Sequence, residues 1–252
     1  MNQFKERVRR GEKMYGSHVF MSDPCLCDII GRLGYDFIWI DMEHCYSSYK
    51  DVLNHITAAH GAGVAAVVRV PQDDLTATKK VLEMGPDGII FPMVRTVEEA
   101  NRLIASTLYP PYGTRGYGPM AANQYGIISG KEFATTGHLD LCRFIQLEHK
   151  DAIDNLEEIT KNEFIDGYIF GPCDLSASIG QIMQTFEPDT IGLIEKGIEI
   201  LKTKNKYIGL STGPDEKVVS YWKEKGVDMI SSGIDYELIR EGAKSVLQML
   251  KG

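Results

Sequence analysis

Short apolar runs rich in β-branched residues alternate along the chain with longer segments of helical period. Eight of the short runs are expected to be strands: Ser17–Met21, Phe37–Ile40, Val64–Arg69, Gly88–Pro92, Cys142–Leu147, Gly167–Phe170, Tyr207–Leu210 and Asp228–Ser231. Eight of the longer segments are expected to be helices: Cys25–Leu33, Ser48–His60, Leu75–Met84, Val97–Ser106, Ile153–Lys161, Thr190–Lys204, Glu216–Glu224 and Tyr236–Leu250. This alternation indicates βαβ units. Eight strands close a (β/α)8 TIM barrel, whereas an open doubly wound sheet usually has fewer, so we expect an α/β barrel.

The residues between these elements are consistent with one continuous barrel. Gly34, Gly61, Gly85 and Gly226 stand where expected helices end, because glycine accepts the left-handed conformation there. The one long irregular segment, residues 109–130, is rich in Gly, Pro and Tyr, and we expect it to be a lid or an interface loop. No low-complexity linker interrupts the pattern, so residues 1–252 are expected to form a single barrel domain.

Four of the expected strands lead into residues that bind metals or move protons. They are Asp41, Glu43 and His44 after the second strand, Arg69 at the end of the third, Gln146 and Glu148 at the end of the fifth, and Cys173 and Asp174 after the sixth. Parallel strands end at the same edge of a sheet, where α/β enzymes keep their active sites. The sequence therefore predicts one shared site.

Glu148 and Asp174 are the candidate metal ligands. Neighbouring parallel strands lie about 4.8 Å apart, so carboxylates at the ends of two of them can share an ion. Two carboxylates, with the remaining positions left to water and substrate, suit Mg²⁺ or Mn²⁺. Gln146 is two residues from Glu148 and should point the same way, towards a substrate oxygen or a metal-bound water. The alternative is that the two acids only cap the helices that follow them.

Arg69 and His44 are the candidate catalytic residues. Arg69 ends an apolar strand, so its guanidinium should stay charged in a dry barrel mouth and stabilise an oxyanion. A structural salt bridge to Asp41 or Glu43 is the alternative, and the two roles are compatible. His44 follows two carboxylates that could orient it as a general base. The other histidines are expected to be ordinary surface or hydrogen-bonded residues: His18, His55, His60, His138 and His149.

Composition and missing motifs narrow the class of protein. The net charge is −8 and there is no long basic run, which argues against nucleic-acid binding. No stretch is apolar enough to span a membrane, and Met1–Lys13 reads as an amphipathic helix, not a signal peptide. Five scattered cysteines indicate reduced thiols and a cytoplasmic protein, with Cys45 and Cys173 as packing residues. No expected strand ends in lysine and no phosphate-binding loop is present, so neither Schiff-base chemistry nor nucleotide use is expected.

Several segments together resemble the HpcH/HpaI aldolase family. They are Asp36–His44, Gly88–Val94, Tyr109–Gly118, Gln146–Glu148 and Asp166–Ser176, within a similarity that runs from about Gly16 to the C-terminal helix. The resemblance implies a class II, metal-dependent pyruvate aldolase of the phosphoenolpyruvate/pyruvate barrel superfamily. It also implies a homo-oligomer, a hexamer or trimer of dimers, in which C-terminal helices swap between subunits.

The resemblance assigns roles to particular residues. Glu148 and Asp174 would ligate Mg²⁺, Mn²⁺ or Co²⁺, and Arg69 would stabilise the pyruvate enolate. His44, supported by Asp41, would be the base. The substrate would be bound by Gln146 and by the segment Gly171, Pro172, Cys173 and Asp174, whose N–H groups would receive its carboxylate. Glu83 matches a position at which relatives carry an aspartate that reaches into a neighbouring site.

The expected reaction is cleavage of a 4-hydroxy-2-keto acid to pyruvate and an aldehyde through a metal-bound pyruvate enolate. Examples of the substrate are 2,4-dihydroxyhept-2-ene-1,7-dioate, from aromatic compound catabolism, and a 2-dehydro-3-deoxy sugar acid. The alternatives are an oxaloacetate decarboxylase, a citrate lyase β-like acyl-CoA lyase, or a non-catalytic barrel that binds small molecules. Met42, Cys173 and His149 depart from the family pattern, which leaves the aldehyde open.

Overall fold

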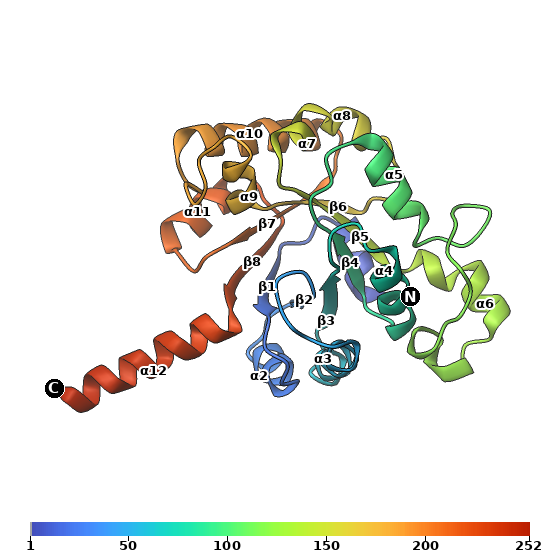
Figure 1. Ribbon diagram of the computed structural model, residues 1–252, viewed down its shortest axis with the longest axis horizontal. Coiled ribbons are helices and arrows are strands. Elements are labelled where there is room, and N and C mark those ends of the chain that lie inside the picture. Colours follow the sequence, from blue (N-terminus) through green and yellow to red (C-terminus); the bar gives the residue numbers. More distant parts are fainter. Residues whose placement is uncertain (1) are drawn as a thin grey trace.

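A closed parallel barrel forms the centre of the molecule in the computed structural model, which describes residues 2–252 (Figure 1). Within these residues, eight strands pair in chain order, and the last pairs with the first. The strands are β1 (Met14–Val19), β2 (Phe37–Asp41), β3 (Ala65–Arg69), β4 (Gly88–Phe91), β5 (Cys142–Leu147), β6 (Gly167–Phe170), β7 (Tyr207–Thr212) and β8 (Met229–Ile234). The predicted (β/α)8 barrel is confirmed.

Helices surround the barrel and connect its strands. They are α1 (Gln3–Arg9), α2 (Cys25–Arg32), α3 (Tyr49–Gly61), α4 (Leu75–Met84), α5 (Val97–Ala105), α6 (Gly130–Thr135), α7 (Lys150–Asp154), α8 (Leu156–Ile159), α9 (Pro172–Ala177), α10 (Pro188–Thr203), α11 (Glu216–Glu224) and α12 (Asp235–Lys251), with short 3₁₀ turns η1 (Ala121–Gly126) and η2 (Gly137–Leu139). Helix α1 confirms the helix that was expected within Met1–Lys13, although Met1 itself lies outside the described residues.

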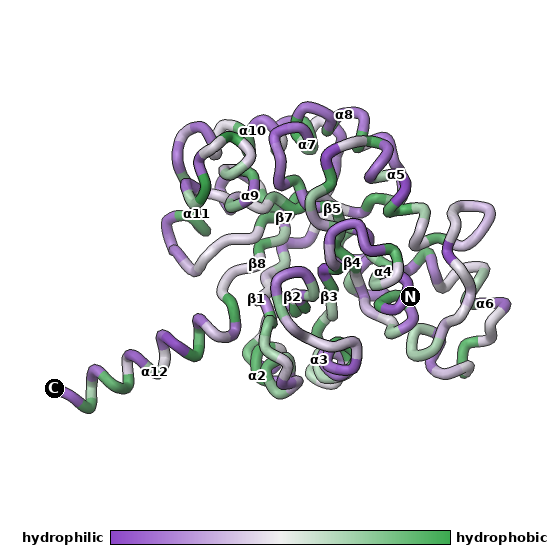
Figure 2. The backbone as a smooth tube through the Cα atoms, viewed as in Figure 1, coloured by the Kyte–Doolittle hydropathy of each residue, from purple (hydrophilic) through white to green (hydrophobic). Residues whose placement is uncertain are grey.

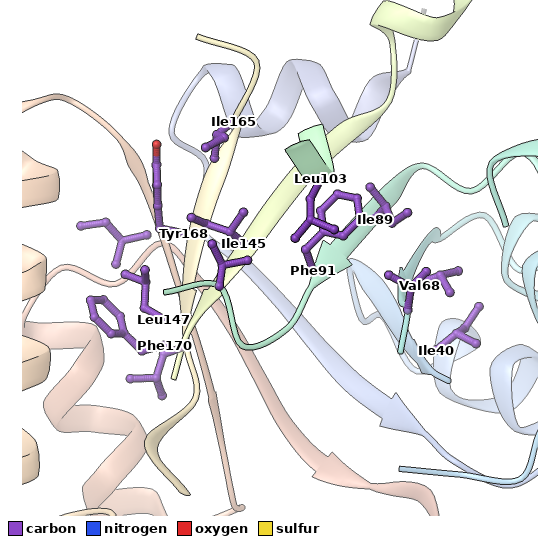
Figure 3. Packing of buried hydrophobic residues seen from close by; sticks show 14 of the residues in the cluster. Ile40, Val68, Ile89, Phe91, Leu103, Ile145, Leu147, Ile165, Tyr168 and Phe170 are labelled. Atoms are coloured by element: carbon purple, nitrogen blue, oxygen red, sulfur yellow. The ribbon is translucent and has the colours of Figure 1, made fainter. Parts of the chain in front are cut away.

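Alternation along each strand creates two apolar layers. In β2, Ile38 and Ile40 pack outwards with the helices, whereas Phe37 and Trp39 pack inside the barrel. Figure 3 shows part of the outer layer. Each strand contributes aliphatic or aromatic side chains to this layer, although β1 contributes only Val19, at its end. The inner layer fills the barrel, so the barrel is a packed core and not a pore.

Helix α1 closes the amino-terminal end of the barrel. Phe4 and Val8 join the inner layer, and the Phe4 ring lies 6.0 Å from that of Phe37. Lys5 is buried, yet its Nζ donates hydrogen bonds to the carbonyls of Leu139 and Leu141 and pairs with Asp166. Because this end is sealed by side chains, the opposite, carboxyl end is the place for a site.

Several boundaries differ from those expected. β1 begins at Met14, three residues earlier than predicted, and ends before Phe20, because the N–H groups of Phe20 and Met21 donate to the Asp235 carboxylate. The helix expected over 153–161 is split into α7 and α8. Gly61 was expected to end a helix in the left-handed conformation, but α3 runs through it and Gly63 (φ 79°) takes that conformation instead.

The irregular segment 109–130 packs beside the barrel. Gly85, at the end of α4, approaches the backbone of Ala122 so closely that a Cβ there would lie 2.9 Å from it. Among the described residues, none of 109–130 lines the cavity at the carboxyl ends of the strands. The segment is therefore not a lid over that cavity within this chain; an interface role stays a prediction.

Helix α12 extends away from the rest of the molecule (Figure 1). Apolar residues recur along it (Figure 2) and several are exposed, including Ile239, Val246, Leu247 and Leu250. None of the helices in residues 2–252 is both long and apolar enough to cross a bilayer.

Candidate active site

A cavity of about 500 Å³ lies at the carboxyl ends of the strands. It is lined by His18, Phe20, His44, Arg69, Gln146, Glu148, Gly171, Pro172, Cys173, Asp174, Met183, Thr185, Ser211, Thr212, Gly213, Gly233, Ile234 and Glu237. The structure thus brings together all but three of the predicted site residues: Asp41 and Glu43 pair with Arg69 behind the cavity lining, and Glu83 lies elsewhere.

The two-residue repeat of the strands explains why polar side chains gather here. Phe37 and Trp39 point into the barrel, so Asp41, at the end of the same strand, does too. Arg69 is two residues after the inward-facing Val67, and Gln146 is two residues after the inward-facing Phe144. The lower inward positions are apolar and fill the core, whereas the last ones are charged or polar and surround the cavity.

Arg69 is held by two carboxylates. Its guanidinium forms an ion pair with Asp41, which is fully buried, and lies 3.2 Å from Oε2 of Glu43. It also lies over the Trp39 ring, 5.4 Å from the centroid. The predicted salt bridge is therefore present, yet Arg69 still lines the cavity. Its Nη1 is 3.5 Å from Oε1 of Gln146, so the cation is fixed at the cavity wall.

Glu148 is a buried carboxylate. Its Oε1 accepts a hydrogen bond of 2.6 Å from Nε2 of Gln146, and its Oε2 accepts one of 2.9 Å from the Met93 N–H. The first contact confirms that Gln146 and Glu148 point the same way. Burial raises the pKa of Glu148 to about 8, although the charge of Arg69 and the Met93 N–H act in the opposite direction.

Gly171 allows the Glu148 carboxylate to sit against β6. A Cβ at this position would lie 2.5 Å from Oε1 and 2.7 Å from Cγ of Glu148. Any larger residue would displace the carboxylate. Glycine is required here by the close approach of a side chain and not by backbone conformation, since its φ is −110°.

Asp174 is the third residue of α9, which begins directly after Gly171. It is exposed at the cavity, and its charge is close enough to raise the pKa of Glu148, as does that of Glu43. Asp41 and Glu43 pair with Arg69, the only lysine or arginine among the described residues that line the cavity, and Glu148 and Asp174 line the same cavity. This excess of carboxylates favours a cation.

A divalent ion held by Glu148 and Asp174 fits this charge distribution. No group of three or more His, Cys, Asp or Glu side chains within residues 2–252 is arranged to hold a metal by itself. Two carboxylates would therefore leave several positions to water and substrate, as Mg²⁺ and Mn²⁺ commonly do. The buried Glu148, which is costly as a free anion, would gain a partner.

His44 is placed differently from the expectation. The Asp41 carboxylate accepts hydrogen bonds from the main-chain N–H groups of Glu43 (3.0 Å) and His44 (2.6 Å), so it shapes the turn. The imidazole itself is 56% exposed, and its Nε2 lies 3.6 Å from Oε2 of Glu43. Glu43, not Asp41, is the carboxylate beside the ring. Burial raises the pKa of Glu43, against the charges of Arg69 and His44.

The remaining predicted residues fall into two groups. Cys173 lines the cavity, and burial together with the charge of Asp174 raises its pKa, so it is a thiol and not a nucleophilic thiolate. His149 accepts a hydrogen bond from the Asp151 N–H and caps α7. Glu83, on α4, lies outside the cavity, where its Oε2 is 3.3 Å from Nη2 of Arg115.

One wall of the cavity was not anticipated. His18 and Ser211 line it, whereas His18 was expected to be an ordinary hydrogen-bonded or surface residue. The strand alternation contained the signal: Met14 and Trp39 point inwards, and positions 16 and 18 of β1 share the face of Met14. The misplaced start of β1 concealed it.

The chain is similar to known proteins over almost its whole length. A model of the HpcH/HpaI aldolase/citrate lyase family matches residues 15–241. The 2-keto-3-deoxy-L-rhamnonate aldolase of Escherichia coli K12 is 32% identical, over 99% of this chain and 93% of that protein. The hydroxypyruvate/pyruvate aldolase of Roseobacter denitrificans is 28% identical, over 98% and 96%. The crystal structure of an HpcH/HpaI aldolase/citrate lyase family protein from Burkholderia cenocepacia matches with a TM-score of 0.94 and 25% identity over 100% of both chains.

Replacing Glu148 with Gln is expected to remove a pH dependence of stability from the metal-free protein. Folding raises the pKa of Glu148 from 4.5 to about 8, so the folded protein holds a proton that the unfolded chain releases. The free energy of unfolding of the wild type should therefore fall as pH rises between these values, by on the order of a few kcal/mol. Urea unfolding of the wild type and E148Q in EDTA measures the difference. Added Mn²⁺ should restore stability at the upper pH in the wild type only; equal responses of the two proteins would contradict the assignment.

Replacing Gly171 with Ala is expected to weaken metal binding, because the new methyl group would overlap the Glu148 carboxylate. We expect the affinity for Mn²⁺, measured by isothermal titration calorimetry, to fall by about tenfold or more. Gly213→Ala is the matched control, since Gly213 also lines the cavity but a Cβ there meets no atom within 4 Å. Similar affinities for both variants would show that Glu148 does not bind the ion.

Proposed function

The chain belongs to the HpcH/HpaI aldolase/citrate lyase family, and from this premise we propose that it cleaves a 4-hydroxy-2-keto acid to pyruvate and an aldehyde. It is a carbon–carbon lyase of the aldolase type. The observation that supports the reaction most strongly is the position of Arg69. Its cation is fixed at the wall of the same cavity that holds the Glu148 and Asp174 carboxylates.

Glu148 and Asp174 would hold a divalent cation, Mg²⁺, Mn²⁺ or Co²⁺. When bound, the ion would supply Lewis acidity that polarises the keto group of the substrate. The charge balance supports this assignment, because Glu148, Asp174 and Glu237 line the cavity, whereas Arg69, its one lysine or arginine among the described residues, is already paired with Asp41 and Glu43. The burial of Glu148 also supports it, since a cation offsets the cost of keeping that carboxylate ionised.

The substrate would be positioned by groups at the ends of β5 and β6. Gln146 faces the cavity from β5 and can donate to or accept from a keto-acid oxygen. The Gly171 N–H donates to the Leu147 carbonyl and Pro172 has no N–H, so the N–H groups of Cys173 and Asp174, which lack partners within α9, would receive the carboxylate. Arg69 lines the same cavity as these groups and His44, and it would stabilise the negative charge that develops on the keto oxygen.

Cleavage then needs one base and one fixed cation. His44 removes the proton of the 4-hydroxyl group, the C3–C4 bond breaks, and the hydroxyl oxygen becomes the carbonyl of the aldehyde. The electron pair of that bond moves into the C2–C3 enolate, whose oxygen accepts hydrogen bonds from Arg69. Protonation at C3 gives the methyl group of pyruvate. His44 is half-exposed at the rim, so it can exchange its proton with solvent.

Replacing His44 with Ala is expected to slow aldol cleavage by about 10²–10⁴-fold, because the 4-hydroxyl proton then lacks its base. Exchange of the methyl protons of pyruvate, which needs no 4-hydroxyl group, should fall much less. Cleavage is measured by coupled pyruvate release from a panel of 4-hydroxy-2-keto acids, with and without EDTA, and exchange by NMR in D₂O.

His60→Ala serves as the control, since His60 pairs with Asp87 outside the cavity. Equal losses of cleavage and exchange in H44A would place the base elsewhere. Pyruvate release without an aldehyde, from oxaloacetate alone, would favour a decarboxylase, and a requirement for a CoA thioester would favour an acyl-CoA lyase.

A homo-oligomer built through α12 accompanies this proposal. Ile239, Ala243, Val246 and Leu250 fall on one side of that helix, and the three larger of them are at least half-exposed. A contiguous apolar stripe on a projecting helix gains stability when another subunit covers it. We expect a hexamer or a trimer of dimers with exchanged helices, in which Glu83 approaches a neighbouring site.

Replacing Val246 with Lys is expected to dissociate this assembly, because a charge enters the apolar stripe. Light scattering coupled to size-exclusion chromatography measures the mass. Gln248→Lys is the matched control, since position 248 lies on the opposite side of α12. A wild-type protein that is already monomeric, or variants of equal mass, would contradict the proposal.

A further inference from the structure

A small hydrogen-bonded cluster occupies the cavity wall formed by β1, β7 and β8. Nε2 of His18 lies 3.2 Å from Oγ of Ser211. Nδ1 of His18 lies 3.3 Å from both the Gly233 carbonyl and Oγ of Ser231. The imidazole ring also packs against Trp39, with centroids 4.8 Å apart, which fixes its position. The reaction described above uses none of these four polar groups.

The surroundings determine which nitrogen of His18 carries the proton. Burial lowers the pKa of His18 to about 4, and the charge of Arg69 acts in the same direction, so the ring is neutral at physiological pH. The Gly233 carbonyl can only accept a hydrogen bond, so the bond between them assigns the proton to Nδ1, with Oγ of Ser231 as a second acceptor of that N–H. Nε2 is then an acceptor, and the hydroxyl group of Ser211 is its donor.

This arrangement makes the Ser211 hydroxyl a hydrogen-bond acceptor towards the cavity. Its single proton is committed to His18, while its oxygen, which accepts no hydrogen bond within residues 2–252, can still accept one from a ligand in the cavity. A ligand group at this place gains a hydrogen bond only if it donates one. A carboxylate or an aldehyde oxygen cannot donate, and an alkyl group would leave the buried lone pairs unsatisfied.

The charges on this side of the cavity also disfavour an anion. Glu237, in the first turn of α12, lines the same cavity as Ser211 and Thr212. Among the described residues that line the cavity, neither β7, β8 nor α12 contributes a lysine or an arginine. A carboxylate at the far end of a substrate would therefore meet a negative charge with no cation to balance it.

We propose that Ser211, oriented by His18, binds a hydroxyl group of the substrate and so selects hydroxylated, uncharged fragments over alkyl or carboxylated ones. Ser211 contacts the ligand, and His18 is a positioning residue. The inference rests on the proposed aldol reaction and deepens it by naming the class of substrate. The hydroxyl group belongs either to the aldehyde or to C3 of a hydroxylated keto acid, and the chemistry of recognition is the same.

The test is selectivity in the direction of aldol addition. The wild type and Ser211→Ala are compared with lactaldehyde against propanal as acceptors, and with hydroxypyruvate against pyruvate as donors. In S211A the ratio of kcat/KM for the hydroxylated to the plain compound should fall by about three- to tenfold in one of the two pairs, as for loss of one hydrogen bond. The change should lie mainly in KM. Comparing ratios between proteins cancels the intrinsic reactivity of each compound.

Two further variants separate recognition from general damage. Ser231→Ala is the matched control, because its hydroxyl contacts the same imidazole but does not line the cavity, and its ratios should equal those of the wild type. His18→Phe keeps a ring against Trp39 but removes the acceptor. The double variant H18F/S211A should lose no more selectivity than S211A alone, because both changes remove the same interaction. Should H18F not fold, S211A and S231A still decide the matter.

The outcomes distinguish this inference from the proposed function. A loss in the aldehyde pair places the hydroxyl group on the aldehyde, and a loss in the keto-acid pair places it at C3. Unchanged ratios in S211A, or a wild type that prefers succinic semialdehyde or propanal to lactaldehyde without any preference for hydroxypyruvate, would overturn the inference. Absence of aldol addition with every acceptor, together with absence of pyruvate proton exchange, would instead overturn the proposed function.

Discussion

The burial of Glu148 is the constraint on which the arrangement of the site depends. Its carboxylate is held in the barrel mouth by Gln146 and the Met93 N–H, and Gly171 leaves just enough room for it. These contacts fix its place but supply no full positive charge, so burial raises its pKa to about 8. A carboxyl group that is held in place but is costly to ionise would be stabilised by the divalent cation proposed above. The exposed Asp174 would leave that cation accessible to substrate.

Arg69 differs from Glu148 in that its charge is already balanced, because two carboxylates pair with it. The ion pair with Asp41, the contact with Glu43 and the Trp39 ring fix the guanidinium from behind while one side faces the cavity. Asp41 is fully occupied by this cation and by two main-chain N–H groups. It therefore cannot also orient the His44 imidazole, as the family resemblance suggested. In the proposed reaction, the rigidly held Arg69 would meet the developing negative charge, and the half-exposed His44 would be the base.

Much of this could be predicted from the sequence, because strand geometry is regular. The bounds of β5, β6, α4 and α11 agree with expectation to the residue, since their apolar runs begin and end sharply. Side chains two residues apart on a strand point the same way, and this places Gln146 beside Glu148 as predicted. Prediction failed where a distant side chain decides the local structure. Asp235, more than two hundred residues away in sequence, captures the N–H groups of Phe20 and Met21 and ends β1, and the error in β1 hid the role of His18. The close contact of Gly171 with Glu148 likewise has no signature in a single sequence.

Asp235 also separates α12 into a first turn that is held by contacts within the chain and a longer part that is exposed. Asp235 is buried, and its bonds to Phe20 and Met21 tie the first turn of the helix to the end of β1, where Tyr236 packs edge-on against Phe20. Glu237 therefore reaches the cavity rim through contacts made within one chain. Beyond this turn the helix extends from the rest of the molecule and exposes its apolar stripe, which the proposed oligomer would cover. The cavity wall that includes Glu237 is thus complete within one chain and would not depend on the proposed partner subunit. Because β1, β8 and the first turn of α12 share these bonds, the anionic rim and the His18–Ser211 pair keep a fixed relation to each other.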